Sequence, residues 1–205
     1  MNSKTNQALS LGPQMVEVFG FQVPTDTYYL HQGHAWAVPQ DNGQVKVGMD
    51  DFSQKILGPA DEIKLPAIGD MHFQDHIGMA LFRKGSKASF VAPVDGTIEA
   101  VNPKVRQKPS LIHDDPYGDG WLFMVRPNNL ERNMENLFYG EANAAWIDRE
   151  SHRLLCLMNT VVGVTLPDGG AVVDDVFGQY PGLGWRRLVQ EFLLTSLSRN
   201  WKNRS

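Results

Sequence analysis

The chain has 205 residues, 42% of them hydrophobic and 20% charged, so it can bury a sizeable core and is not disordered in composition. Its 19 basic and 23 acidic residues give a net charge of −4, which disfavours broad binding to nucleic acid. The single cysteine, Cys156, excludes an internal disulfide and a multi-thiolate metal site. The sequence shows neither an apolar run as long as a membrane span nor a signal-peptide pattern. We therefore expect a cytoplasmic protein that contacts neither membrane nor nucleic acid.

Short strands dominate the first part of the chain. Residues 1–18 are expected to form a flexible tail. Over residues 19–127, Gly and Pro recur at close intervals, which is typical of a β-rich domain with many turns. Asp41-Asn42-Gly43 predicts a hairpin turn between two apolar runs, and residues 93–96 (PVDG) predict a second turn.

Helices are predicted over two ranges before the C-terminal part, and the second range is divided at Gly140. Residues 50–57 (DDFSQKIL) form a short candidate, with Asp50 as its N-cap. Residues 128–155 are expected to be helical, with apolar positions at helical spacing and a break at Gly140.

A C-terminal extension is predicted over residues 156–205. Residues 160–166 and 171–173 are expected to pair as a β-hairpin. The strongest amphipathic helix follows, with apolar residues at Trp185, Leu188, Val189, Phe192, Leu193 and Leu197. This stripe is expected to pack on its own domain, and the alternative is a homodimer or docking face.

A series of collinear blocks runs through the middle of the chain. They are His34-Ala35-Trp36, 47–54 (VGMDDFSQ), 65–70 (LPAIGD), 92–96 (APVDG) and 111–122 (LIHDDPYGDGWL). In order and spacing, over roughly residues 20–130, the chain resembles the H protein of the glycine cleavage system, a lipoyl-carrier family. The family's corresponding motifs include H-E-W, V-G-I-T-x-[YF]-A-Q and L-[VI]-N-x-[DS]-P-Y-[GE]-x-G-W-[LM].

The resemblance implies a fold, which the pattern of strands and helices supports. A barrel-sandwich hybrid, mainly β, is expected over residues 19–127 and is followed by C-terminal helices. Residues after about 155 lie beyond the family's usual extent, so the chain is identified as a divergent member with an added β-hairpin and helix.

The resemblance also implies a lysine on a tight hairpin as the lipoyl attachment site. The family segment G-x-V-E-S-V-K-A-A-S-D-L-x-A-P falls on residues 78–93 here, with one extra residue. Counting forward from Gly78 gives Lys84, and Gly85 beside it favours a turn. Lys87 is the weaker candidate because it falls in the returning strand. The family's acidic residue three before the lysine is replaced by Leu81, which puts the modification in doubt.

Other groups of reactive residues have the spacing or composition of possible sites. His31 with His34, and His72 with His76, are spaced like metal ligands, but no cysteine partner exists, and we expect no metal. The carboxylates of Asp114, Asp115 and Asp119 are expected to serve turn structure rather than a cation. Cys156 is expected to be buried and inert, and no nucleophile motif is present.

We favour a non-catalytic H-protein-like scaffold or interaction module without a lipoyl group. The alternative is a lipoyl carrier that shuttles a group between enzymes through Lys84. A remote alternative is a metalloenzyme built on His31, His34, His72 and the turn at Asp114. In the first two interpretations the partners are other proteins of a multienzyme system, and the chain is not itself an enzyme.

Overall fold

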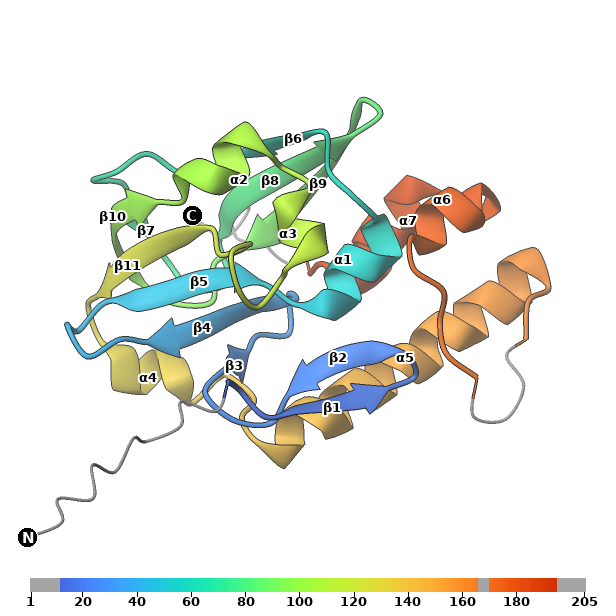
Figure 1. Cartoon of the computed structure of the whole chain (residues 1–205), viewed down its shortest axis with the longest axis horizontal. Helices are drawn as coiled ribbons and strands as arrows, with labels where there is room; N and C mark the ends of the chain where they lie inside the picture. Colours follow the sequence, from blue (N-terminus) through green and yellow to red (C-terminus); the bar gives the residue numbers. More distant parts are fainter. Residues whose placement is uncertain (1–11, 166–169, 195–205) are drawn as a thin grey trace, which may run out of the picture.

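The computed structural model describes residues 12–165 and 170–194 (Figure 1). Its strands are β1 (Met15–Val18), β2 (Phe21–Pro24), β3 (Tyr29–Leu30), β4 (Ala35–Pro39), β5 (Val45–Met49), β6 (Glu62–Lys64), β7 (Met71–His72), β8 (Ile77–Arg83), β9 (Ser86–Val91), β10 (Gly96–Val101) and β11 (Phe123–Pro127). Its helices are α1 (Asp51–Leu57), α2 (Pro103–Gln107), α3 (Leu111–Asp114), α4 (Leu130–Met134), α5 (Glu141–Val162), α6 (Val176–Gln179), the 3-10 turn η1 (Pro181–Leu183) and α7 (Trp185–Phe192).

Two antiparallel sheets build the sandwich, and β1 and β2 form a separate two-stranded sheet. The larger one has six strands in the order β3-β4-β5-β11-β10-β7, and the smaller one has three in the order β6-β8-β9. Both sheets contribute buried side chains to one hydrophobic core. Among them are Trp36, Ile98, Phe123, Leu81 and Phe90. The predicted mainly β sandwich with C-terminal helices is confirmed.

The β4–β5 hairpin forms where the turn Asp41-Asn42-Gly43 predicts it, and its register pairs Trp36 with Gly48. Gly48 is required there because a Cβ atom at this position would lie 2.2 Å from the Trp36 ring. The helix α1 follows β5 directly. Asp50 caps it as predicted, since its side chain accepts a hydrogen bond from the backbone N–H of Ser53.

The segment Met15–Val18 is more ordered than the sequence indicates. Residues Met15–Val18, expected to lie in a tail, pair with β2 along the full length of β1. Figure 1 shows this hairpin lying beside α5, and several residue pairs join α5 to both strands. Paired backbone groups and packing on α5 order a segment whose own side chains are mostly exposed.

The predicted hairpin over residues 160–173 is wrong. The helix α5 continues through Val162 and ends at Gly163, whose backbone is left-handed with φ 70°. Residues 170–173 form no strand, and residues 166–169 lie outside the described part. Three consecutive β-branched residues, from Thr160, favour a strand locally, but the hydrogen bonds of a helix already 19 residues long extend over them.

The C-terminal amphipathic helix is shorter than its apolar pattern predicts. It ends at Phe192, and the predicted position Leu197 lies outside the described residues. Trp185, Leu188 and Phe192 are buried in the chain's own core. Cys156, expected to be buried, is exposed on α5. None of the helices within residues 12–165 and 170–194 has the length and apolar character needed to cross a bilayer.

Candidate functional site

Lys84 lies at the tip of the β8–β9 hairpin. Arg83 pairs with Ser86, so Lys84 and Gly85 form a two-residue turn. Both have positive φ, 48° and 75°, which is the pattern of a type I′ turn. The residue reached by counting forward from Gly78, Lys84, is thus the first of the two turn residues. In Figure 1 this tip projects beyond the body of the sandwich.

Lys84 is exposed, and among the described residues its one hydrogen-bond partner is the Asp61 carboxylate, which accepts the backbone N–H at 2.5 Å. Lys87 is also exposed, but it lies within β9 opposite Phe82 rather than in the turn. Leu81, which replaces the family's acidic residue, is 1% exposed and packs in the core. The hairpin therefore presents Lys84 outward and turns Leu81 inward.

Arg83 joins the base of this turn to the C-terminal extension. Its guanidinium is buried, donates to the carbonyl of Leu57 at 2.5 Å, and forms a bidentate pair with Asp175. Partial burial by itself raises the pKa of the Asp175 carboxyl. Hydrogen bonds from Arg83 and from the Gly178 N–H overcome this effect, so the pKa is lowered. The ring of Phe177 lies over the guanidinium at 5.6 Å.

The other strand of the hairpin is held by Trp185, the first residue of α7. Its indole N–H donates to the carbonyl of Lys87 at 2.9 Å. Sequence reasoning missed both contacts, because Asp175 and Trp185 are 92 and 98 residues from their partners. The extension therefore braces both strands immediately beside the Lys84 turn.

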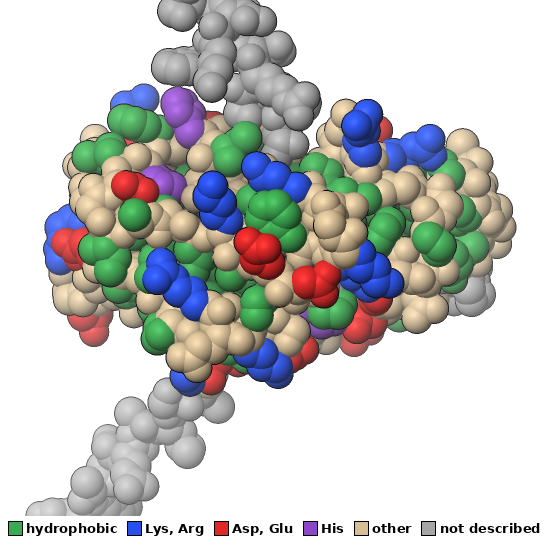
Figure 2. All heavy atoms as spheres, turned by 90° about the horizontal axis from the view of Figure 1, so that it is seen from above, with side chains coloured by type: hydrophobic (Ala, Val, Ile, Leu, Met, Phe, Trp, Pro, Cys, Tyr) green, Lys and Arg blue, Asp and Glu red, His purple; other side chains and the backbone are tan. Residues whose placement is uncertain are grey.

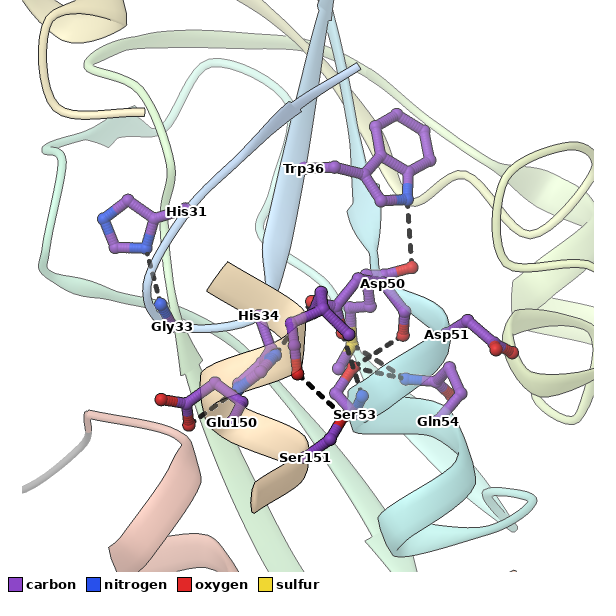
Figure 3. Close-up of polar contacts among 12 residues, drawn as sticks. His31, Gly33, His34, Trp36, Asp50, Asp51, Ser53, Gln54, Glu150 and Ser151 are labelled. Carbon is purple, nitrogen blue, oxygen red and sulfur yellow. Dashed lines mark hydrogen bonds and ion pairs between the residues drawn. The ribbon is translucent and has the colours of Figure 1, made fainter. Parts of the chain in front are cut away.

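A second polar cluster lies inside the molecule, around His34 (Figure 3). The His34 Nδ1 atom is 2.8 Å from Asp50 Oδ2, and Nε2 is 3.8 Å from Glu150 Oε2. The imidazole is stacked between the rings of Phe52 and Trp146, with centroids 4.5 and 4.7 Å away. The cluster thus connects β4, α1 and α5.

This environment favours the charged imidazolium. Burial by itself lowers the pKa of His34, but the charge and hydrogen bond of Asp50, together with Glu150, raise it to about 9. Burial raises the pKa of Glu150, and its interactions with His34 and Arg153 overcome this effect and lower it. His34 therefore carries its charge at neutral pH, in a site that is 0% exposed.

The other histidines do not converge on a metal site. His31 Nδ1 accepts the Gly33 N–H, so Nε2 donates to Asp75 at 2.9 Å. His72 packs against the Phe123 ring. Within residues 12–165 and 170–194, no group of three or more His, Cys, Asp or Glu side chains is arranged to hold a metal ion.

Of the three carboxylates near Pro116, Asp115 serves the turn as predicted, whereas Asp114 and Asp119 form ion pairs with lysines. The Asp115 side chain accepts the Asp119 N–H at 2.6 Å, and Asp114 and Asp119 pair with Lys108 and Lys104. Asp114 and Asp115 line one side of an open cleft of about 810 Å³ between α1, α3 and the start of β1. Its acidic groups are therefore engaged in turns and ion pairs.

The fold is a lipoyl-domain-like sandwich, the fold class of small carrier proteins. It is defined by two apposed sheets of short strands, with a short helix after β5 and further helices after β11. The family model for the glycine cleavage H-protein matches residues 27–150, and the chain belongs to that family. Residues after 150, which include α6 and α7, lie outside the matched region.

Individual relatives agree with this assignment. The chain is 35% identical over 132 residues to a glycine cleavage system H protein of Xanthomonas campestris pv. campestris, covering 64% of this chain and 98% of the relative. It is 41% identical over 106 residues to a probable glycine cleavage system H protein of Natronomonas pharaonis, covering 51% and 82% of the two chains. The crystal structure of an H protein from Mycobacterium marinum matches with a TM-score of 0.53 and 25% identity, over 60% of this chain and 98% of the other.

Proposed function

We propose that this protein is a lipoyl carrier whose arm is attached to Lys84. The observation that carries the proposal is the place of Lys84 at the exposed apex of a two-residue hairpin turn. An attachment enzyme must enclose the amine, and partner enzymes must later admit the arm, so the lysine has to stand clear of the fold. Membership of the H-protein family supports the same conclusion.

The residues present suit the attachment. The Lys84 ammonium makes no hydrogen bond or ion pair within the described part of the chain, so binding an enzyme breaks no internal contact of this group. In the reaction, Nζ loses a proton and attacks the activated lipoyl carboxyl carbon. An amide forms, and the activating group leaves with the bonding electron pair. A bound lipoyl group supplies a dithiolane that accepts a chemical group from one enzyme and passes it to another.

In this proposal the partners are enzymes of a glycine-cleavage-type system, and the chain supplies no catalytic residue of its own. The alternative is a scaffold that has lost the arm. Leu81, buried where the family has an acidic residue, favours the alternative because an enzyme that requires that carboxylate would not find it.

One experiment separates the two functions. The protein is produced with lipoate and the lipoate ligase of the same organism, and its intact mass is measured. A carrier gains the mass of one lipoyl group, which Lys84→Arg abolishes and the matched variant Lys87→Arg retains. An unchanged wild-type mass, with a ligase proven active on another carrier, supports the scaffold. Modification that survives in Lys84→Arg contradicts the assigned residue.

A further inference from the structure

Four basic side chains that have no acidic partner among the described residues lie on the Lys84 hairpin and at the start of α7, the helix that contacts it. Lys84, Lys87, Arg186 and Arg187 are all exposed. Within the described residues, none of the four side chains forms an ion pair or hydrogen bond. Arg83, by contrast, is buried and neutralised by Asp175. Figure 2 shows basic and acidic side chains interspersed over one face of the molecule. Two exposed carboxylates also lie at the hairpin: Asp61, which accepts the Lys84 N–H, and Glu62, which is paired with Phe82. The four cations outnumber them, so the local surface is positive in a chain whose net charge is −4.

The brace between the extension and the hairpin brings these charges together. Trp185 donates to the Lys87 carbonyl, and Arg186 and Arg187 follow it at the start of α7. Because Trp185 is 9% exposed and packs edge-on against Phe177, the start of α7 is fixed against β9.

We propose that Lys84, Lys87, Arg186 and Arg187 form a basic collar, a docking surface for an acidic face of the enzyme that attaches the lipoyl group to Lys84. This inference rests on the proposed function. An acidic partner is repelled by the chain's overall negative charge, so a local positive surface directs its approach to the hairpin. The extension supplies half of the collar, Arg186 and Arg187, from outside the region that the family model matches.

The collar also distinguishes substrate from product. Amide formation removes the charge of Lys84, so the modified protein offers three cations where the unmodified protein offers four. The electrostatic attraction to an acidic enzyme face is weaker after the reaction, which favours release of the product.

The test compares two double variants with the same loss of charge. Arg186→Gln/Arg187→Gln removes two collar cations. The control, Arg132→Gln/Arg149→Gln, removes two exposed arginines on α4 and α5 whose side chains have no partner in the described residues. Initial rates of lipoyl attachment by the ligase of the same organism are measured against carrier concentration, at low and high NaCl. Thermal unfolding verifies that each variant is folded.

The collar variant is expected to raise KM for the carrier about tenfold at low salt with kcat unchanged, and added salt shrinks the difference. The control is expected to change KM less than about twofold. Equal KM values in the two variants, or a difference that does not respond to salt, would overturn the collar while leaving Lys84 lipoylation intact. A wild-type protein that is never lipoylated overturns the proposed function itself, and the collar with it.

A nucleic-acid partner is the competing use of such a surface. It is tested by binding to a short RNA hairpin and a DNA duplex. Binding to either that the collar variant loses, with KM for the ligase unchanged, contradicts the proposal. Absence of binding, together with the KM effect, supports an acidic protein partner.

Discussion

The imidazole of His34 and the carboxylate of Asp50 lie 2.8 Å apart in a site where both side chains are 0% exposed. Asp50 also caps α1 through its other oxygen, which accepts the Ser53 N–H at 2.8 Å. One carboxylate thus fixes the start of α1 and balances a buried charge. Glu150 extends the cluster to α5, so this interaction ties the sandwich to that helix.

Replacing His34 with Gln is expected to destabilise the protein by about 3–5 kcal/mol, because the Asp50 carboxylate is left buried without its cation. Urea unfolding measures the change. His31→Gln is the control, since the carboxylate partner of His31, Asp75, is largely exposed, and its loss is expected to cost less. Equal effects of the two substitutions would contradict a special role for the buried pair.

Stability is expected to fall at alkaline pH. The pKa of His34 is raised from 6.5 to about 9 in the folded protein. Its contribution is therefore fully present below about pH 6.5 and is lost as the pH rises through 9. The free energy of unfolding, measured by urea between pH 6 and 10, should decline across this window. The decline should be much smaller in His34→Gln, and parallel curves for the two proteins would assign the decline to other groups.

Gly48→Ala is expected to be strongly destabilising, because the added Cβ meets two Trp36 ring atoms at 2.2 and 2.4 Å. The Trp36 indole is held by the carbonyls of Met49 and Pro116 and has little freedom to move aside. We expect a loss of about 1–3 kcal/mol by thermal or urea unfolding. Gly12→Ala, where a Cβ meets open space, provides the control. A Gly48→Ala protein as stable as that control would show that the indole shifts freely.

Asp175→Ala is expected to cost about 3 kcal/mol, because Arg83 stays buried without its counter-ion and α6 loses its N-cap. The double variant Arg83→Met/Asp175→Ala removes the stranded charge and should recover much of that loss. Urea unfolding of both variants measures the recovery. A double variant less stable than Asp175→Ala would mean that the bond from Arg83 to the Leu57 carbonyl dominates instead.

Local patterns were sufficient for the features whose determinants lie close in sequence. Asp50 caps α1 through a bond that spans three residues, and Asp41-Asn42-Gly43 closes a hairpin between adjacent strands. The turn at Lys84 and Gly85 is equally local, and the resemblance in residue order added the family.

The tertiary structure decided the rest, because those features depend on partners far along the chain. Thr160 has strand propensity but lies in α5, and Cys156 has apolar neighbours but points to solvent. The residues around Arg83 do not indicate that its charge is neutralised. Its partner, Asp175, lies 92 residues away in the sequence. Propensity and spacing describe interactions of neighbouring residues, whereas burial and charge pairing are set by whichever distant segments the folded chain packs together.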